Sequence, residues 1–207
     1  MRTRIKICGV TSVADALRCA DAGADAVGLV FYPRSPRCVT VERAAEIVRA
    51  LPPFVTAVGL FVNPKPADVD SVLASCPVGL LQFHGDESPE FCARFGHPYL
   101  KALRVQPGVD LLECLRPYEA ASGWLLDAFR EGEYGGTGTA FDWDLVPPGL
   151  ARPVVLSGGL SPENVSEAVR RVRPWAVDVS SGVESAKGIK DPARVAAFIA
   201  GVRNADV

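Results

Sequence analysis

The sequence predicts an α/β protein, a single-domain (β/α)8 TIM barrel, on the basis of three observations. Eight short apolar runs alternate with segments of helical periodicity along the 207 residues. A strand, a helix and then another strand imply parallel neighbours joined by a right-handed crossover. The length allows one sizeable core, so we expect residues 1–207 to form one domain with few insertions. An open, doubly wound sheet is the alternative that the same repeat permits.

The strands are expected where β-branched, apolar runs stand between turn-forming residues. In chain order they cover residues 4–8, 26–31, 55–62, 78–83, 98–103, 123–127, 153–157 and 176–180. The helices are expected where apolar residues recur three and four positions apart. They cover residues 12–22, 41–51, 66–75, 88–95, 108–118, 161–172 and 192–202, with a brief further candidate at 141–145.

Local signals mark several helix starts and one loop. Ser161-Pro162 places a capping hydroxyl before a proline at the first helical position, and Asp191-Pro192 repeats the arrangement. Ser88 precedes a proline in the same way. Residues 129–139 contain several glycines and predict a loop after the sixth strand.

Composition narrows the classes of partner. Lys and Arg number 22 against 24 Asp and Glu, and without a basic run we expect no nucleic-acid partner. No apolar stretch is long enough to cross a bilayer, so we expect a soluble, cytoplasmic protein without a membrane partner. The six cysteines lack CxxC or other metal spacing, which predicts no metal site and five reduced structural residues.

Cys8 ends the first expected strand. Side chains alternate along a strand, so Lys6 and Cys8 share one face. A neighbouring ammonium favours thiolate over thiol, which makes Cys8 a candidate base. The alternative is a small buried hydrophobe.

Three other polar residues follow strand ends. Asp127 rises from an apolar strand, which could raise its pKa and suit a general acid, or it could pair with Lys101. His84 could bind a ligand or brace a loop. Arg37 lies in a loop that two prolines rigidify, and its planar guanidinium suits a carboxylate. A solvated surface charge is the alternative for Arg37.

Two neighbouring loops predict a phosphate site. Gly158 and Gly159 follow the seventh strand, and Ser180, Ser181 and Gly182 follow the eighth. Glycines let backbone amides approach an anion, and barrels of this class often bind phosphate at these loops.

The carboxyl ends of the strands meet at one rim, where barrels of this class have their active site. The residues expected at this rim are Cys8, Arg34, Arg37, His84, Asp127, Asp178, Gly158, Gly159, Ser180, Ser181 and Gly182.

Short motifs occur along nearly the whole chain: KICG (6–9), FYPRSPR (31–37), LQFHG (81–85), LLD (125–127), GGTG (135–138), FDW (141–143), LSGG (156–159) and DVSSGVE (178–184). In order and spacing this set resembles the phosphoribosylanthranilate isomerase family of tryptophan biosynthesis.

The resemblance implies an Amadori rearrangement of N-(5-phosphoribosyl)anthranilate to 1-(2-carboxyphenylamino)-1-deoxyribulose 5-phosphate, without metal or organic cofactor. It implies that Asp127 protonates the ribose ring oxygen and that Cys8 removes the proton from C2. Arg37 looks like the anchor for the anthranilate carboxylate, and the loops at 158–159 and 180–182 look like the phosphate cradle. His84 and Asp178 are family motif positions whose duties stay open.

Two other functions remain as alternatives. Another phosphosugar isomerase or epimerase would typically use paired aspartates or a metal, whereas here Cys8 ends the first strand. A non-catalytic barrel that binds a phosphometabolite would need neither Cys8 nor Asp127. The expected partner is the small phosphosugar–anthranilate substrate, and the chain is expected to be a monomer or a homodimer.

Overall fold

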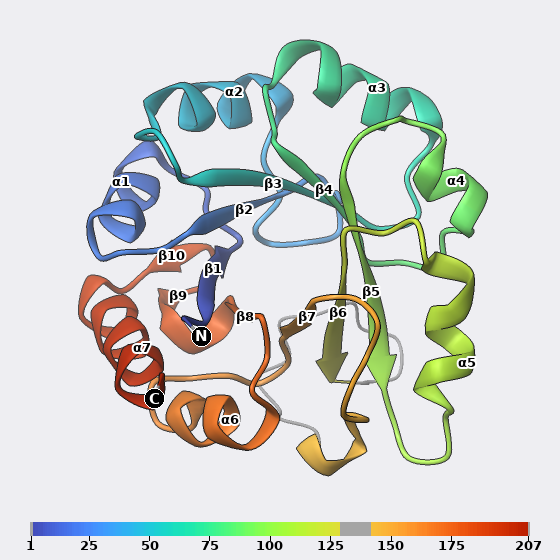
Figure 1. Cartoon of the computed structure of the whole chain (residues 1–207). Coiled ribbons are helices and arrows are strands. Elements are labelled where there is room, and N and C mark those ends of the chain that lie inside the picture. The colour runs from blue at the N-terminus through green and yellow to red at the C-terminus, as the bar shows by residue number, and fades with distance from the viewer. Residues whose placement is uncertain (1, 129–141, 207) are drawn as a thin grey trace.

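Residues 2–128 and 142–206 are described by a computed structural model, in which eight parallel strands close into a barrel (Figure 1). The last strand pairs with the first, so the open-sheet alternative is wrong and the (β/α)8 barrel is confirmed. The strands are β1 Arg4–Cys8, β2 Ala26–Val30, β3 Thr56–Phe61, β4 Leu80–Phe83, β5 Tyr99–Val105, β6 Gly123–Ala128, β7 Val154–Leu156 and β8 Ala176–Val179.

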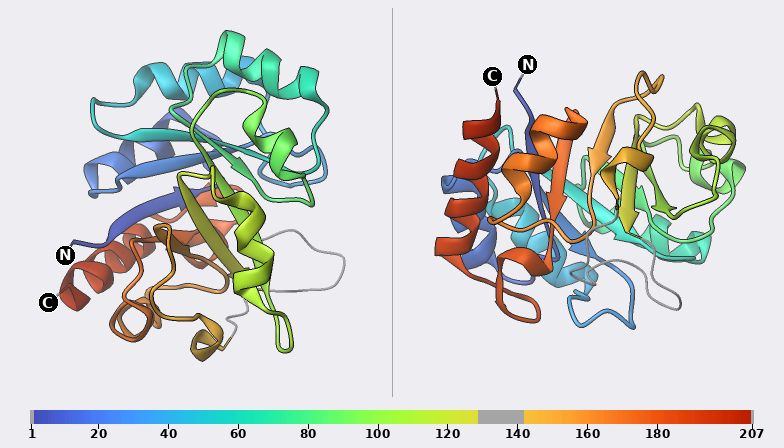
Figure 2. Two further views of the ribbon diagram at one scale, coloured as in Figure 1. Left: turned by 45° about the vertical axis from the view of Figure 1, so that its right-hand side comes forward. Right: turned by 90° about the horizontal axis from the view of Figure 1, so that it is seen from below.

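Helices surround the barrel in the order the sequence predicts (Figure 2). They are α1 Val13–Asp21, α2 Val41–Ala50, α3 Pro66–Ser75, α4 Pro89–Ala93, α5 Leu111–Leu115, α6 Val165–Val172 and α7 Pro192–Ala205, with 3-10 turns η1 Arg116–Tyr118, η2 Trp143–Leu145 and η3 Ser181–Val183. Among the residues described, no helix is long and apolar enough to cross a membrane. Of the candidate helix at 141–145, residue 141 lies outside the described ranges, and most of the rest is the 3-10 turn η2.

Two predicted caps form and one does not. Ser88 accepts a hydrogen bond from the Phe91 amide, and Asp191 accepts from the amides of Ala193 and Arg194. The expected helix at 161–172 begins only at Val165. The side chain of Asn164 instead bonds back to the Ser161 amide and the Gly159 carbonyl, which holds residues 161–164 as a turn beside the rim.

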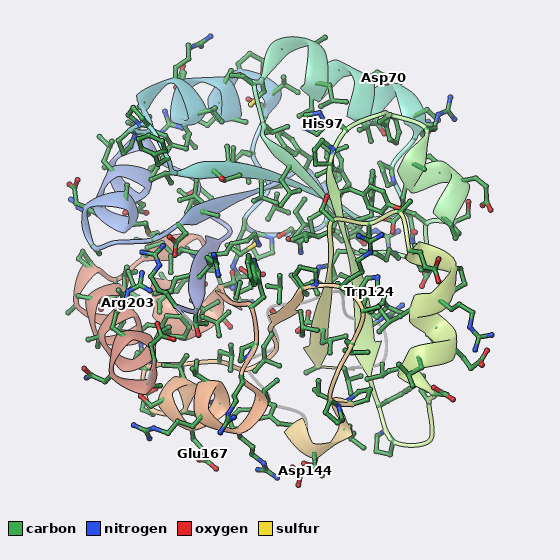
Figure 3. All side chains as sticks on the ribbon, viewed as in Figure 1. Asp70, His97, Trp124, Asp144, Glu167 and Arg203 are labelled. Atoms are coloured by element: carbon green, nitrogen blue, oxygen red, sulfur yellow. The ribbon has the colours of Figure 1, made fainter. Side chains whose placement is uncertain are left out.

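Alternation along the strands separates two packing layers. Outward-facing residues such as Ile5, Ile7 and Leu126 join the large core between barrel and helices. Inward-facing Leu100, Leu125 and their neighbours form a small apolar cluster inside the barrel. Side chains fill the barrel's interior, so it is a packed core and not a pore (Figure 3).

A hairpin that the sequence analysis missed follows β8. Strands β9 (Glu184–Ala186) and β10 (Ile189–Lys190) pair antiparallel, and Gly188 has φ +82° between them. The strands are too short to show an alternating pattern. The hairpin is anchored near the first barrel strand by a hydrogen bond from the Thr11 hydroxyl to the Gly188 carbonyl, 2.7 Å long.

The amino ends of the strands surround a second, apolar cavity of about 220 Å³. Leu80, Leu100 and Val155 contribute to its lining. The loop between α2 and β3 lies at this end and carries Phe54, which is fully exposed (102%) and has φ +71°. Bulky residues rarely adopt that backbone conformation.

Candidate active site

A cavity of about 420 Å³ lies at the carboxyl ends of the strands, which is the size of a small-molecule site. Its lining includes Cys8, Arg34, Arg37, His84, Asp127, Asp178 and Ser180 from the predicted rim, together with Gln82, Ser157 and Lys187. The other predicted rim residues, Gly158, Gly159, Ser181 and Gly182, stand in the adjoining loops without lining it. Residues far apart in the chain therefore converge on one site.

Cys8 is the last residue of β1, and its side chain is buried. Burial raises the pKa of the Cys8 thiol, and this effect outweighs the lowering by the nearby Lys6 ammonium. Lys6 thus favours the thiolate as expected, but burial, with a smaller contribution from the Asp178 carboxylate, leaves the pKa of Cys8 raised. The free thiol is the resting form near neutral pH, and the thiolate is a stronger base once it forms.

Lys6 has a closer partner than Cys8. Its Nζ donates to both carboxylate oxygens of Asp178, each at 2.9 Å, and both side chains are buried. Burial by itself lowers the pKa of Lys6, but the Asp178 carboxylate and, to a smaller extent, Cys8 together more than reverse this and leave the pKa raised. Asp178 therefore lines the cavity while paired with Lys6, which stays protonated.

Asp127 forms a chain of contacts with β4. Its Oδ2 lies 3.0 Å from His84 Nε2, and His84 Nδ1 lies 2.9 Å from Gln82 Nε2. The Ala128 amide donates to the other carboxylate oxygen at 2.9 Å. When Gln82 donates, Nδ1 is the acceptor and the Nε2–H of His84 points at Asp127. The sequence analysis gave Gln82 no role, although it lies two residues before His84 and its side chain should therefore point to the same side.

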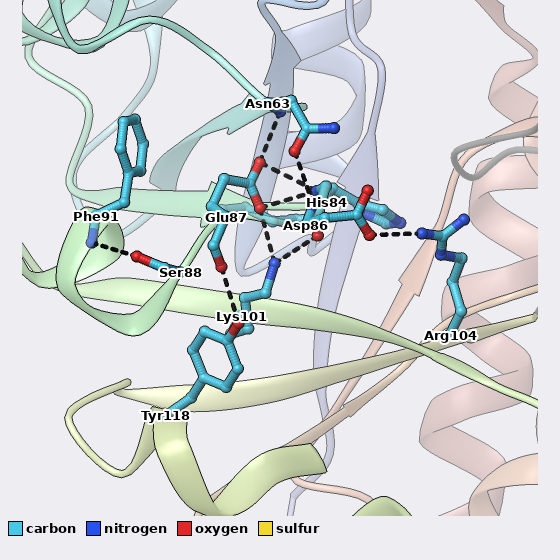
Figure 4. Close-up of polar contacts among 11 residues, drawn as sticks. Asn63, His84, Asp86, Glu87, Ser88, Phe91, Lys101, Arg104 and Tyr118 are labelled. Atoms are coloured by element: carbon cyan, nitrogen blue, oxygen red, sulfur yellow. Dashed lines mark hydrogen bonds and ion pairs between the residues drawn. The ribbon is translucent and has the colours of Figure 1, made fainter. Parts of the chain in front are cut away.

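The alternative prediction, that Asp127 pairs with Lys101, is wrong. Lys101 lies on the outward face of β5, where its Nζ is 2.7 Å from Glu87 Oε2 and 5.5 Å from the centroid of the Tyr118 ring (Figure 4). Glu87 also accepts hydrogen bonds from the amides of Gly85 and Asn63. This buried network, which the sequence analysis missed, fixes the turn that follows His84.

Arg37 is mostly buried, with a side chain 11% exposed, so the surface-charge alternative is wrong. Its Nε and Nη2 donate to the two carboxylate oxygens of Glu184, both at 2.7 Å. The hydrogen bonds to Glu184 raise the pKa of Arg37, so the guanidinium stays charged. Sequence reasoning gave Glu184 no role, although it ends the last motif.

Glycines at the two predicted phosphate loops allow close packing. Gly158 has φ +84°, and a Cβ there would lie 2.4 Å from the Ala128 amide nitrogen and 2.9 Å from Asp127 Oδ1. A Cβ on Gly182 would lie 2.0 Å from the Leu160 carbonyl oxygen. The loops after β7 and β8 therefore lie against each other beside Asp127.

Comparison with known proteins gives a match over most of the chain. The family model for N-(5'-phosphoribosyl)anthranilate (PRA) isomerase matches residues 5–201. The chain belongs to this family. The N-(5'-phosphoribosyl)anthranilate isomerase of Thiobacillus denitrificans is 60% identical over 199 residues, which are 96% of this chain and 97% of that protein.

Solved structures of the family have the same fold. The phosphoribosyl anthranilate isomerase of Thermotoga maritima is 42% identical, with a TM-score of 0.90 over 98% of this chain and 99% of that one. A second family structure, 40% identical with a TM-score of 0.84 over 98% and 99% of the two chains, holds reduced 1-(o-carboxyphenylamino)-1-deoxyribulose 5-phosphate. The family's glycine-rich motif at 135–138 lies outside the described residues here.

Proposed function

We propose that this chain is the phosphoribosylanthranilate isomerase of tryptophan biosynthesis, which rearranges N-(5-phosphoribosyl)anthranilate to 1-(2-carboxyphenylamino)-1-deoxyribulose 5-phosphate. The main support from the geometry is that a thiol and a carboxyl group line one cavity from strands that are not neighbours, β1 and β6. An aldose-to-ketose rearrangement needs both an acid and a base at the sugar, and such groups can act from two sides of one bound ring.

The reaction divides into two proton transfers. The carboxyl group of Asp127 protonates the ring oxygen, the C1–O bond breaks, and the anilino nitrogen supplies the electron pair that forms the Schiff base. Cys8 as thiolate then takes the C2 proton, and the C2–H electrons form the enolamine. The enolamine tautomerises to the ketone, which completes the rearrangement. The contact from His84 Nε2 to Asp127, 3.0 Å long, supports a role for His84 in orienting the acid.

Substrate binding uses the rest of the rim. Arg37 is the proposed partner of the anthranilate carboxylate because an arginine fork suits a planar anion. The phosphate is assigned to the amides and hydroxyls of the loops at 158–159 and 180–182. Asp178 holds the Lys6 ammonium in place, and the positive charge of Lys6 favours the Cys8 thiolate that the second step requires, whereas the Asp178 carboxylate itself raises the pKa of Cys8.

The decisive experiment follows the fluorescence of freshly made phosphoribosylanthranilate with and without the protein. We expect the decay to be much faster with the protein, and Cys8→Ala or Asp127→Asn should each remove most of that acceleration. Cys38→Ser, which changes an exposed thiol, is the control and should behave as wild type. Full activity in Cys8→Ser would contradict the assignment of Cys8 as base, because an alcohol is far less acidic than a thiol.

We also propose that the enzyme acts in the cytoplasm. All six cysteines are unpaired thiols in the structure, which is the usual state in a reducing compartment. Fractionation of the source cells, followed by the same fluorescence assay, tests this: activity in the cytoplasmic fraction is the expected result.

A further inference from the structure

Glu184 is a buried acid that the proposed reaction does not use. It is the first residue of β9, in the hairpin after β8, and its side chain is 5% exposed. It bonds to Arg37 and, at 2.8 Å, to the Nζ of Lys190 in the paired strand. Burying a carboxylate costs free energy because it loses its hydration, and here the ion pairs with Arg37 and Lys190 offset that cost.

Arg37 is held at two points along its side chain. Its stem crosses the backbone at Gly9, where a Cβ would lie only 2.4 Å from Arg37 Cδ. Its guanidinium is then fixed by the two hydrogen bonds to Glu184. The glycine of the KICG motif therefore makes room for the stem, and Glu184 sets the orientation of the head.

This arrangement leaves one edge of the guanidinium available. Glu184 takes Nε and one hydrogen of Nη2, and within the described residues Nη1 donates to no acceptor. Arginine has five N–H donors in a rigid fork, so Nη1 and the second hydrogen of Nη2 can hold another carboxylate in two parallel bonds. Arg37 also lines the cavity.

The charges of the cluster support an anionic ligand. Lys190 is buried, with a side chain 2% exposed, and also donates to the Ser180 carbonyl at 3.1 Å. Arg37 and Lys190 together carry two positive charges against the one negative charge of Glu184. A ligand carboxylate at the free edge of Arg37 would neutralise this group, and Arg34 and Lys187 line the same cavity.

We infer that Glu184 is a positioning residue that determines substrate specificity by presenting the free edge of Arg37 to the carboxylate on the substrate's aromatic ring. The inference rests on the proposed function, since it assumes the phosphoribosylanthranilate substrate. It goes further by giving the β9–β10 hairpin a role, which is to hold Glu184 where it orients Arg37. Glu184 acts through Arg37 and touches no reacting atom.

The test compares two substrates in wild type and in Glu184→Gln. One is phosphoribosylanthranilate, and the other is N-(5-phosphoribosyl)aniline, which lacks the carboxylate. The neutral amide places an NH₂ against the guanidinium and breaks the paired hydrogen bonds. We expect kcat/KM for the carboxylated substrate to fall about tenfold or more, mainly through KM, because the lost interaction is already made in the bound ground state. For the aniline substrate kcat/KM should stay within about twofold.

A second variant and a control complete the experiment. Glu184→Asp keeps the negative charge beside Lys190 but is one methylene too short for both bonds to Arg37. It should show a smaller loss with the same dependence on substrate, and it serves if Glu184→Gln does not fold. Glu42→Gln removes an exposed acid from the first turn of α2 and should change neither substrate's kinetics.

The outcomes separate the inference from the proposed function. If wild type does not accelerate the isomerisation, the proposed function fails. If wild type is active and the Glu184 variants lower kcat/KM equally for both substrates, or for neither, the function stands and the inference is overturned. A loss confined to the carboxylated substrate supports it.

Discussion

The two ends of the barrel are filled by different kinds of residue. At the carboxyl end, ion pairs with largely buried side chains surround the 420 Å³ cavity and its adjoining loops: Lys6–Asp178, Lys101–Glu87, Arg37–Glu184 and Lys190–Glu184. At the amino end, the 220 Å³ cavity is lined mainly by apolar side chains. The strands are the same, and only the residues that they present differ.

The two ends therefore contribute to different properties: the apolar amino end to stability and the charged carboxyl end to function. A buried ion pair adds little net stability, because desolvating the two charges offsets their attraction, whereas removing one partner is strongly destabilising. Burying apolar area stabilises by about 25 cal/mol per Å². We therefore expect changes at the carboxyl end to affect chemistry, or to leave a charge unpaired, and changes at the amino end to affect folding alone.

The largest expected effect is on catalysis at the carboxyl end. Cys8→Ala and Asp127→Asn should each lower kcat/KM by about 10²–10⁴-fold, the usual contribution of a general acid or base. The midpoint of thermal unfolding should stay within a few degrees of wild type, because neither change leaves a buried charge. Steady-state kinetics and a thermal melt check both. A midpoint of thermal unfolding far below that of wild type would mean that these variants lose activity because the fold is destabilised.

The next largest effect concerns a pair beside the site. Lys101→Met leaves the buried carboxylate of Glu87 without its cation, so the free energy of unfolding should fall by about 3–5 kcal/mol. Urea denaturation measures it. The double variant Lys101→Met with Glu87→Gln should recover much of the loss, since no charge then remains buried. Equal losses in the single and double variants would contradict this electrostatic account.

A substitution at the amino end should affect stability alone. Leu100→Ala removes apolar contacts inside the barrel and should lower the free energy of unfolding by about 2–3 kcal/mol. At 25 °C its kcat/KM should equal that of wild type. Leu112→Ala, at an exposed leucine of α5, is the control and should change stability by less than about 0.5 kcal/mol. A change in kcat/KM for Leu100→Ala would show that the two ends are coupled.

The pH dependence of the reaction tests the environment of Cys8. The base must be deprotonated and Asp127 protonated for the wild-type reaction, so the test uses Asp127→Asn, in which the acid no longer titrates. Its residual kcat/KM should rise with pH, up to the pKa of Cys8. Burial raises the pKa of Cys8, which places the rising limb above the reference of about pH 8.5 for a free thiol. Each pH unit of displacement is a tenfold change in rate, about 1.4 kcal/mol. A limb that ends near pH 7 would mean that Lys6 outweighs burial in the free enzyme.

The smallest expected effect is at Phe54, on the exposed loop of the amino end. Phe54→Gly relieves the φ of +71° and loses no burial, so the free energy of unfolding should rise by up to about 1 kcal/mol. Thermal melts at several protein concentrations measure it. A concentration-dependent loss of stability would show that the ring is covered by a second copy in solution, which also decides between monomer and homodimer.

The fold and most of the rim followed from local rules. Alternation placed Cys8 and Asp127 on inward faces, and the rule that carboxyl ends share one rim brought them together with His84. The same alternation could have excluded Lys101 as the partner of Asp127, but only with the register of β5 and β6, which pairs Lys101 with Trp124. The helix start at 161 was wrong because Asn164 bonds back into the loop.

By itself the sequence determined the barrel, the residues at its rim and their resemblance to one family, because strand periodicity, turn residues and motif spacing are local properties of the chain. Only the tertiary structure decided which charges pair. Arg37 and Glu184 are 147 residues apart in the chain, and Lys6 and Asp178 are 172 apart. Burial and ion pairing depend on such long-range contacts, so the raised pKa of Cys8 and the orientation of Arg37 appear only in the folded protein.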